Sequence, residues 1–230
     1  MKNKKGLSHI EVILSFVIFL GFLIFILAIF NPFRLSSDNA GEIYLAEKEI
    51  VAYSSLEVKF LSLVLNYIPN KCFYFNYSLD EVIAKDEFYN FTPAYSIQQN
   101  NEIYINGTNR FYYILSSDEF EERDFSGQCT GLEKTNYTLG LFTKYNMTSY
   151  AKMTELANRH NSDYLSLKSE LKIPASDDFA FSISDSLNNL LLNISKKPPS
   201  NAKVVARDVP IQLVYKNGTI IYAKLNIKVW

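Results

Sequence analysis

One long stretch without charged residues dominates the N-terminal part of the chain. Val12–Phe30 comprises 19 residues without a charge, and only Ser15 and Gly21 interrupt its aliphatic and aromatic side chains. At about 1.5 Å per residue, a helix of this length spans most of a bilayer core of about 30 Å. The pattern therefore predicts one transmembrane helix. Asn31-Pro32 is expected to end it, because proline disfavours the helical conformation of the residue before it.

Charges around this stretch predict its direction. Lys2, Lys4 and Lys5 precede it, whereas only Arg34 follows closely. Positive residues stay on the cytoplasmic side, so we expect a single-pass cell-membrane protein with a cytoplasmic N-terminus and an extracellular C-terminal domain. A cleavable secretory signal would have a shorter apolar region and a small-residue cleavage site, which NPFRLSSDNAG does not offer.

The rest of the chain alternates apolar and polar residues in short stretches, as half-buried strands do. EIYINGTNRFYYIL is predicted to form a hairpin around Asn106-Gly107, and VPIQLVYKNGTIIYAKLNIKVW a second one around Asn217-Gly218. Two predicted strands precede both hairpins: LEVKFLSLVLNYI and KCFYFNYS. In the last arm, alternate residues are predicted to share a buried face: Ile221, Ala223, Leu225, Ile227 and Val229.

Helical spacing is found in fewer places. DNAGEIYLAEKEIVAYSS favours a short amphipathic helix, although it is also compatible with the lead-in to a strand. A longer helix is predicted from Ser149 to Leu171, ended by Pro174. Its apolar positions are Met153, Leu156, Ala157, Tyr164, Leu165 and Leu167. DFAFSIS then reads as a strand with one buried face, and SDSLNNLLLNIS as a shorter helix.

These elements predict the fold class. We expect α+β, with a single N-terminal transmembrane helix followed by an extracellular domain dominated by antiparallel β-strands with one longer helix. A domain of about 200 residues is large enough to bury a real core. The many aromatic residues, 16 Tyr and 17 Phe, favour strands over helices.

The chain has only two cysteines, Cys72 and Cys129. Both follow the predicted membrane helix, so they are expected to lie where a disulfide persists. Such a bond would close a loop of nearly sixty residues, worth about 4 kcal/mol in the loop-entropy model. The alternative is a pair of buried free thiols.

Seven N-x-[ST] sequons are a second feature expected of an extracellular domain, and they are more than this composition gives by chance. The candidate glycosylation sites are Asn76, Asn90, Asn106, Asn136, Asn146, Asn193 and Asn217. Asn90 is the weakest candidate, because Pro93 follows its threonine.

The residues around GLSHIEV resemble the processing site of type IV pilins, in particular archaeal pilin-like proteins with a class III signal peptide. The resemblance rests on a basic tip, Gly6, the long apolar helix and Glu11. It implies that a prepilin peptidase cuts between Gly6 and Leu7, which makes Glu11 the fifth mature residue. The domains would then be a cytoplasmic leader (1–6), a transmembrane and assembly helix (7–31) and an extracellular α+β domain (32–230).

The same resemblance gives Glu11 a role. Its carboxylate could pair with the new amine at Leu7, in the same subunit or in a neighbour, and so set the register of assembly. The simpler alternative is a glutamate at headgroup level that reaches water and complements the helix dipole. An early break at Asn31-Pro32 and a large outer domain depart from major filament pilins. A minor or accessory subunit is therefore expected.

Catalytic motifs are absent from the sequence: no HExxH, CxxC, GxSxG or phosphate-binding glycine loop is present. His160 is interpreted as a solvated residue on the longer helix. The acidic stretch SSDEFEERDFSG lacks the spacing of a calcium loop. Its carboxylates are Asp118, Glu119, Glu121, Glu122 and Asp124. We therefore expect no enzyme, no metal site and no cofactor.

Two function classes follow. The first is a pilin-like surface protein that joins a type IV pilus-like filament for adhesion, with membrane lipid, the prepilin peptidase and other pilin-like subunits as partners. The second is an uncleaved, membrane-tethered surface module that binds a glycan, a protein or an envelope component without polymerising. The net charge of −1 gives no indication of nucleic-acid binding.

Overall fold

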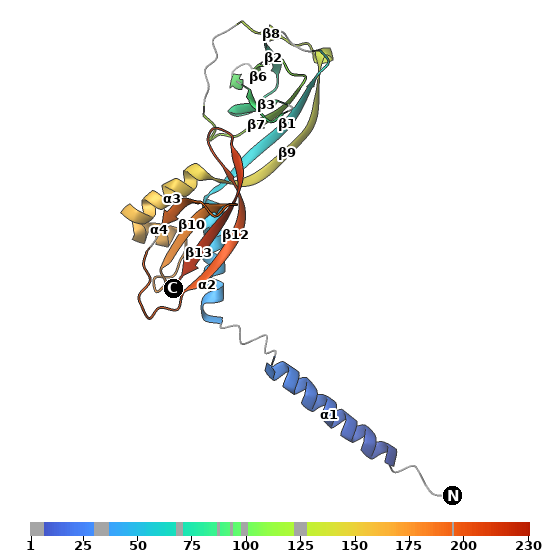
Figure 1. Ribbon diagram of the computed structural model, residues 1–230, viewed down its shortest axis with the longest axis vertical. Helices are drawn as coiled ribbons and strands as arrows, with labels where there is room; N and C mark the ends of the chain where they lie inside the picture. Colours follow the sequence, from blue (N-terminus) through green and yellow to red (C-terminus); the bar gives the residue numbers. More distant parts are fainter. Residues whose placement is uncertain are drawn as a thin grey trace, which may run out of the picture. The chain divides into compact units, whose positions relative to one another are not determined.

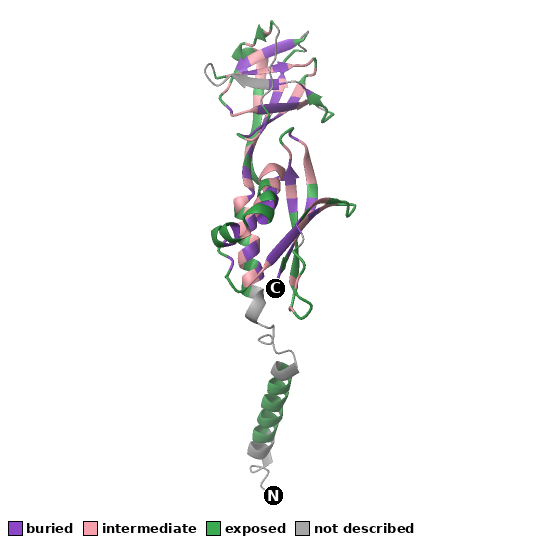
Figure 2. Ribbon diagram, turned by 90° about the vertical axis from the view of Figure 1, so that its left-hand side faces the viewer, coloured by how far each residue is buried: buried purple, intermediate pink, exposed green. Residues whose placement is uncertain are grey.

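The computed structural model describes residues 7–29, 37–67, 71–86, 88–92, 94–97, 101–121, 128–194 and 196–230. Contacts between residues divide the chain into two compact units, Met1–Glu42 and Ile43–Trp230. The first unit contains helix α1 (Leu7–Ile29) and the start of helix α2 (Ser37–Tyr53). Every α1 side chain whose burial is described, from Val12 to Ile26, is exposed (Figure 2).

The membrane prediction is corrected by the structure. Among the helices that the structure describes, none is long and apolar enough to cross a membrane. The predicted fold class, with its transmembrane helix, and the predicted single-pass localisation were therefore wrong. The apolar run lies within α1 up to the last residue of this helix, Ile29, and the helix begins before the run, at Leu7 among polar residues. The predicted stop at Asn31-Pro32 and the flanking charges lie outside the described residues.

Strands dominate the second unit (Figure 1). Within the described residues, a nine-stranded sheet has the order β11-β10-β13-β12-β9-β1-β7-β3-β4, and a four-stranded sheet has the order β5-β6-β2-β8. The strands of the large sheet are β1 (Ser55–Leu65), β3 (Val82–Asp86), β4 (Phe91–Thr92), β7 (Phe111–Ser116), β9 (Tyr137–Ser149), β10 (Phe179–Asp185), β11 (Leu190–Ile194), β12 (Val205–Val214) and β13 (Ile220–Val229). Those of the small sheet are β2 (Cys72–Asn76), β5 (Ala94–Ile97), β6 (Glu102–Asn106) and β8 (Thr130–Gly131).

The described part of this unit also contains most of α2 (residues 43–53), the helices α3 (Tyr150–Ser162) and α4 (Tyr164–Glu170), and the 3₁₀ turn η1 (Lys134–Asn136). One hydrophobic core joins α2, α3 and α4 to strands β10 to β13, with Ile50, Leu156 and Phe181 at its centre. A second core lies between the two sheets and includes Leu63 and Phe73. The long strands β1 and β9, which pair with each other, connect the regions of these two cores.

The C-terminal hairpin is confirmed. β12 and β13 pair from Val205–Val229 to Val214–Ile220, and the turn holds Gly218 at a φ of 80°. Glycine adopts this left-handed conformation without steric cost. Four of the five predicted face residues are buried, and Ile221 is partly buried.

The other predicted hairpin is wrong. β6 pairs with β2 and β5 in the small sheet, whereas β7 pairs with β1 and β3 in the large one. The segment around Asn106-Gly107 therefore crosses between sheets. The backbone N–H of Gly107 donates to the carbonyl of Lys71 at 2.9 Å, and a side chain here would collide with Tyr112.

The helix predictions had mixed outcomes. The amphipathic helix is confirmed as α2, with Ile43, Ala46 and Ile50 buried. The longer helix is divided at Asp163, whose φ of −144° and ψ of 58° are not helical. Leu165, predicted to be apolar core, is 78% exposed.

The segment predicted as a short helix, SDSLNNLLLNIS, is instead a turn followed by β11. The Asp185 carboxylate accepts hydrogen bonds from the backbone N–H groups of Leu187 and Asn189, both at 2.8 Å. Aspartate side chains that bond the following backbone in this way favour turns over helices. Asn188 completes the turn with a φ of 63°.

Candidate binding groove

An open groove of about 520 Å³ lies on one face of the large sheet, where β7, β1 and β9 are neighbours. Its volume is within the range of roughly 300–1,000 Å³ typical of small-molecule sites. β1, β7 and β9 supply most of its lining, and β12 and β13 supply the rest. The lining residues are Phe60, Ser62, Phe111, Tyr113, Leu141, Thr143, Tyr145, Met147, Gln212 and Ile220.

Strand register explains why these side chains meet. Ser62 of β1 lies opposite Tyr113 of β7, and Phe60 of β1 lies opposite Thr143 of β9. Opposed residues share a face of a sheet, and so do residues two apart along one strand. The intervening β1 residues, such as Leu61, point the other way into the core between the sheets.

Aromatic rings in the groove hold one another in place. The rings of Phe60 and Tyr145 are 5.3 Å apart at 88°, and those of Phe111 and Tyr113 are 4.6 Å apart at 75°. Such edge-to-face contacts are favourable beyond simple burial. Tyr145 is nevertheless 49% exposed and Leu141 is 70% exposed, so a ligand could reach both side chains.

Tyr89 extends this aromatic surface beyond the groove. Its ring stacks on that of Tyr113 at 5.1 Å and 8°, and a hydrogen bond with Tyr89 raises the pKa of Tyr113. Tyr89 has a φ of 59°, which is unusual and costly for a bulky residue. The turn between β3 and β4 therefore holds the ring at a conformational cost.

Asp86 organises that turn. Its Oδ1 accepts hydrogen bonds from the backbone N–H groups of Phe88 and Asn90, both at 2.9 Å, and Oδ2 accepts one from the Asn109 amide at 3.0 Å. Removal from water acts to raise the pKa of Asp86, but these hydrogen bonds outweigh it and lower the pKa. The carboxylate thus stays charged and keeps its partners.

The C-terminal hairpin closes one end of the groove, where Gln212 and Ile220 belong to the lining. The turn can lie close to the sheet because its Gly218 has no side chain. A Cβ there would come within 2.7 Å of the Ile83 side chain. Val214 anchors the same hairpin in a small core with residues of β1 and β7.

No Asp, Glu, Lys, Arg or His belongs to the described lining. Lys59 pairs with Asp80 at 2.5 Å and Lys144 with Glu57 at 3.0 Å. Lys59 on β1 and Lys144 on β9 alternate with the groove residues of these strands. Both lysine side chains therefore face the other side of the sheet. On β3, Lys85 lies opposite Tyr113 and so shares the face of the groove, but it is not part of the lining. The described lining itself therefore carries no charged side chain.

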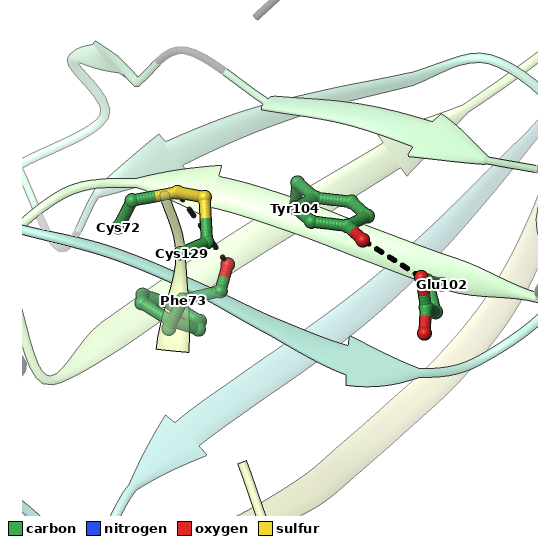
Figure 3. The surroundings of a disulfide bond; sticks show 5 residues. All are labelled: Cys72, Phe73, Glu102, Tyr104 and Cys129. Atoms are coloured by element: carbon green, nitrogen blue, oxygen red, sulfur yellow. Dashed lines mark hydrogen bonds between the residues drawn. A yellow bond between two sulfur atoms is a disulfide. The ribbon is translucent and has the colours of Figure 1, made fainter. Parts of the chain in front are cut away.

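The predicted disulfide is confirmed between Cys72 and Cys129, whose Cα atoms are 4.7 Å apart (Figure 3). β2 and β8 pair in parallel, with Phe73 opposite Thr130. Each cysteine directly precedes one of these two residues, so the register places the sulfur atoms side by side. The disulfide lies in the small sheet and takes no part in the groove.

His160 was wrongly interpreted as a solvated surface residue. It is 6% exposed, and its Nε2 lies 3.1 Å from the carbonyl oxygen of Phe179. Its ring makes edge contacts with the rings of Tyr164 and Phe179. Burial lowers the pKa of His160 and raises that of Tyr164. The sequence did not indicate that His160 is buried, because its polar neighbours lie on the other face of α3 and only one face of this helix packs against the core.

We expect stability to fall as the pH drops below about 6.5, the ordinary pKa of histidine. The folded state lowers the pKa of His160, so the unfolded chain binds more protons between the two pKa values. This contribution is complete above the unfolded pKa and decreases below it. Urea unfolding at pH 7.0 and pH 5.2 measures the effect. The His160→Gln variant should lose less stability over this interval, and an equal loss in both proteins would contradict the assignment.

The predicted processing residues are only partly described. Gly6 lies outside the described residues, and Leu7 is the first residue of α1. Glu11 lies within α1, but its side chain is not among those described.

The acidic stretch is not arranged as a cation site where it is described. The Glu119 carboxylate accepts a hydrogen bond from the Ser149 hydroxyl and pairs with Lys152 at 3.1 Å. Glu122 and Asp124 lie outside the described residues. In the described part of the chain, no group of three His, Cys, Asp or Glu residues could hold a metal ion.

All seven sequon asparagines lie in the described part of the chain, and their use as glycosylation sites stays a prediction. Five are exposed: Asn76, Asn90, Asn146, Asn193 and Asn217. Asn106 and Asn136 are half-buried.

Sequence reasoning did not find the groove. The available signal was a set of strands with apolar residues on both alternating faces, such as FYYILS in β7 and LGLF in β9. Comparison with known proteins finds no matching family model, no matching characterised protein and no matching solved structure.

Proposed function

We propose that the chain is a pilin-like protein that assembles, as a minor or accessory subunit, into a type IV pilus-like filament for adhesion. The observation that carries this proposal is the exposure of apolar side chains all around α1. Phe16 is 60% exposed, Val17 58% and Ile18 64%. These three consecutive residues point to different sides of the helix, since successive positions are about 100° apart.

Exposed apolar surface of this extent requires a partner. Monomeric proteins rarely expose contiguous apolar patches larger than a few hundred Å². α1 has no polar face along its described side chains, Val12–Ile26, because Ser15 and Gly21 are the only residues that are not strongly apolar. Packing of α1 helices from several copies in a filament core would bury all sides at once.

The proposed processing fits this assembly. Cleavage by a prepilin peptidase between Gly6 and Leu7 removes the lysine-rich tip and leaves an amine at the first residue of α1. Glu11 lies about one helical turn further on. In a packed helical core, its carboxylate is tolerated only if it is paired, for which the new amine of a neighbour is suited. The pair would specify register more than it stabilises the filament.

In this proposal, the second unit is the part of the subunit that contacts other surfaces during adhesion. The disulfide Cys72–Cys129 persists in an oxidising compartment. The groove on the large sheet favours a second candidate function, a binding module that does not polymerise. Mass spectrometry of the N-terminus after co-expression with the peptidase separates the two: a mature chain starting at Leu7 supports the filament subunit, and an intact Met1 supports the module.

The Glu11→Ala variant should be cleaved normally but form no filaments, because the new amine loses its partner in the apolar core. Mass spectrometry reports the cleavage, and electron microscopy of the co-expressed protein reports the filaments. Glu133→Ala is the matched control, since Glu133 is exposed on the second unit. Normal filaments from Glu11→Ala would show that the carboxylate has no role in register.

A further inference from the structure

The groove combines apolar rings with uncharged polar groups. Phe60, Phe111, Tyr113 and Tyr145 supply the rings. Within the described residues, no hydrogen-bond partner is found for the side chains of three polar residues of the lining: Ser62, Thr143 and Gln212. These hydroxyl and amide groups are half-buried along the groove and can both donate and accept hydrogen bonds.

This chemistry excludes several kinds of ligand. A nucleic acid or an acidic polymer requires basic side chains, and none belongs to the lining. An acyl chain would leave the hydroxyls of Ser62 and Thr143 and the amide of Gln212 without partners, at a cost in binding free energy. The ligand must therefore be uncharged, offer apolar surface to the rings and supply hydroxyl groups to the edges.

We propose that the groove binds a short segment of an uncharged oligosaccharide. Pyranose rings carry C–H groups on their faces and hydroxyls on their edges, which matches the aromatic rings and the polar groups of the floor. Neighbouring strands lie about 4.8 Å apart and alternate residues along a strand about 6.8 Å apart, so two or three sugar units span the groove.

The turn between β3 and β4 adds a second observation. Tyr89 keeps a costly left-handed conformation in which its ring, 66% exposed, stacks on that of Tyr113. Strained residues often mark binding sites, because the surrounding structure holds them where a ligand needs them. The Asp86 hydrogen bonds hold this turn before any ligand arrives. Tyr89 thus lengthens the aromatic platform along which a glycan chain would lie.

This inference does not depend on filament formation. All the residues concerned belong to the unit Ile43–Trp230, and none belongs to α1. A chain that binds the glycan without polymerising would support the groove assignment and contradict only the filament.

Calorimetric titration of the full chain tests the proposal, in a detergent without a sugar headgroup. The probes are cellohexaose, mannohexaose and maltohexaose, with hexagalacturonate as the acidic control. We expect at least one neutral probe to bind and the acidic one not to bind. Tyr145→Ala should weaken binding about tenfold, because aromatic residues at the centre of a contact contribute most of its affinity.

Three variants make the test specific. Leu141→Asp places a charge in the groove and should abolish binding, and its parent side chain is exposed, so the fold should tolerate the change. Tyr44→Ala removes an exposed tyrosine of α2, outside the groove lining, and should bind normally. Thermal unfolding followed by circular dichroism confirms that Tyr145→Ala and Leu141→Asp are folded.

Other occupants give different results. Absence of binding by all three neutral probes, equal binding of hexagalacturonate, or unchanged affinity in Tyr145→Ala would overturn the proposal. If Tyr145→Ala instead removed self-association in sedimentation, or prevented filament formation, the groove would be an interface between copies of the chain. Tyr145→Ala should therefore form filaments whenever the unaltered protein does.

Discussion

Replacing both cysteines by serine is expected to lower the free energy of unfolding by about 4 kcal/mol. Cys72 and Cys129 are 57 residues apart, so the bond restricts a long loop of the unfolded chain. The loop contains β3 and β7 of the large sheet as well as β5 and β6 of the small one. Urea unfolding of the full chain, followed by tyrosine fluorescence, measures the decrease in the free energy of unfolding of the second unit.

The small sheet should respond most strongly. β8 consists of only two residues, Thr130 and Gly131, which pair with β2. Without the disulfide, only its two-residue pairing with β2 attaches this short edge strand to the sheet. Reduction of the unaltered protein with dithiothreitol is the control, since it breaks the same bond without substitution and should reproduce the loss. A decrease below 1 kcal/mol in both proteins would show that the loop is restricted by other contacts.

Local patterns predicted those elements whose partners are close in sequence. β12 and β13 are joined by a turn whose Gly218 adopts a left-handed conformation, so alternation and turn chemistry identify the whole hairpin. The same signals around Asn106-Gly107 led to a wrong pairing. β6 and β7 alternate as hairpin arms do, but β6 pairs with β2 and β5 of the small sheet, whereas β7 pairs with β1 and β3 of the large one. Which partner a strand chooses depends on long-range packing, which one strand's sequence does not contain.

The groove could not be predicted either, because it too depends on long-range packing. β1 carries Phe60 on one face and Leu61 on the other, and both are apolar. Only the tertiary structure shows that the small sheet covers Leu61 while the face of Phe60 is left open. His160 is the converse case: polar neighbours in the sequence suggested an exposed position, yet the helix turns it towards Phe179.

Substituting Phe179 by alanine is expected to lower the free energy of unfolding by about 3–5 kcal/mol. The ring is fully buried in the core that joins the helices to β10. It stacks on Tyr164 at 5.6 Å and meets the edge of His160 at 5.1 Å. Removing the ring leaves a cavity beneath α3 and α4, which carry His160 and Tyr164. Phe88→Ala is the control with the same change in composition, and it should cost little because Phe88 is 72% exposed.

The same variant should also alter the response to pH. The low pKa of His160 arises mainly from burial, and Phe179 is one of the residues that keep water away from its ring. With Phe179→Ala, water can approach the imidazole, so its pKa rises towards the unfolded value. The stability difference between pH 7.0 and pH 5.2 should then decrease relative to the unaltered protein, as it does when His160 itself is replaced. An unchanged pH dependence in Phe179→Ala would show that other residues determine the burial of His160.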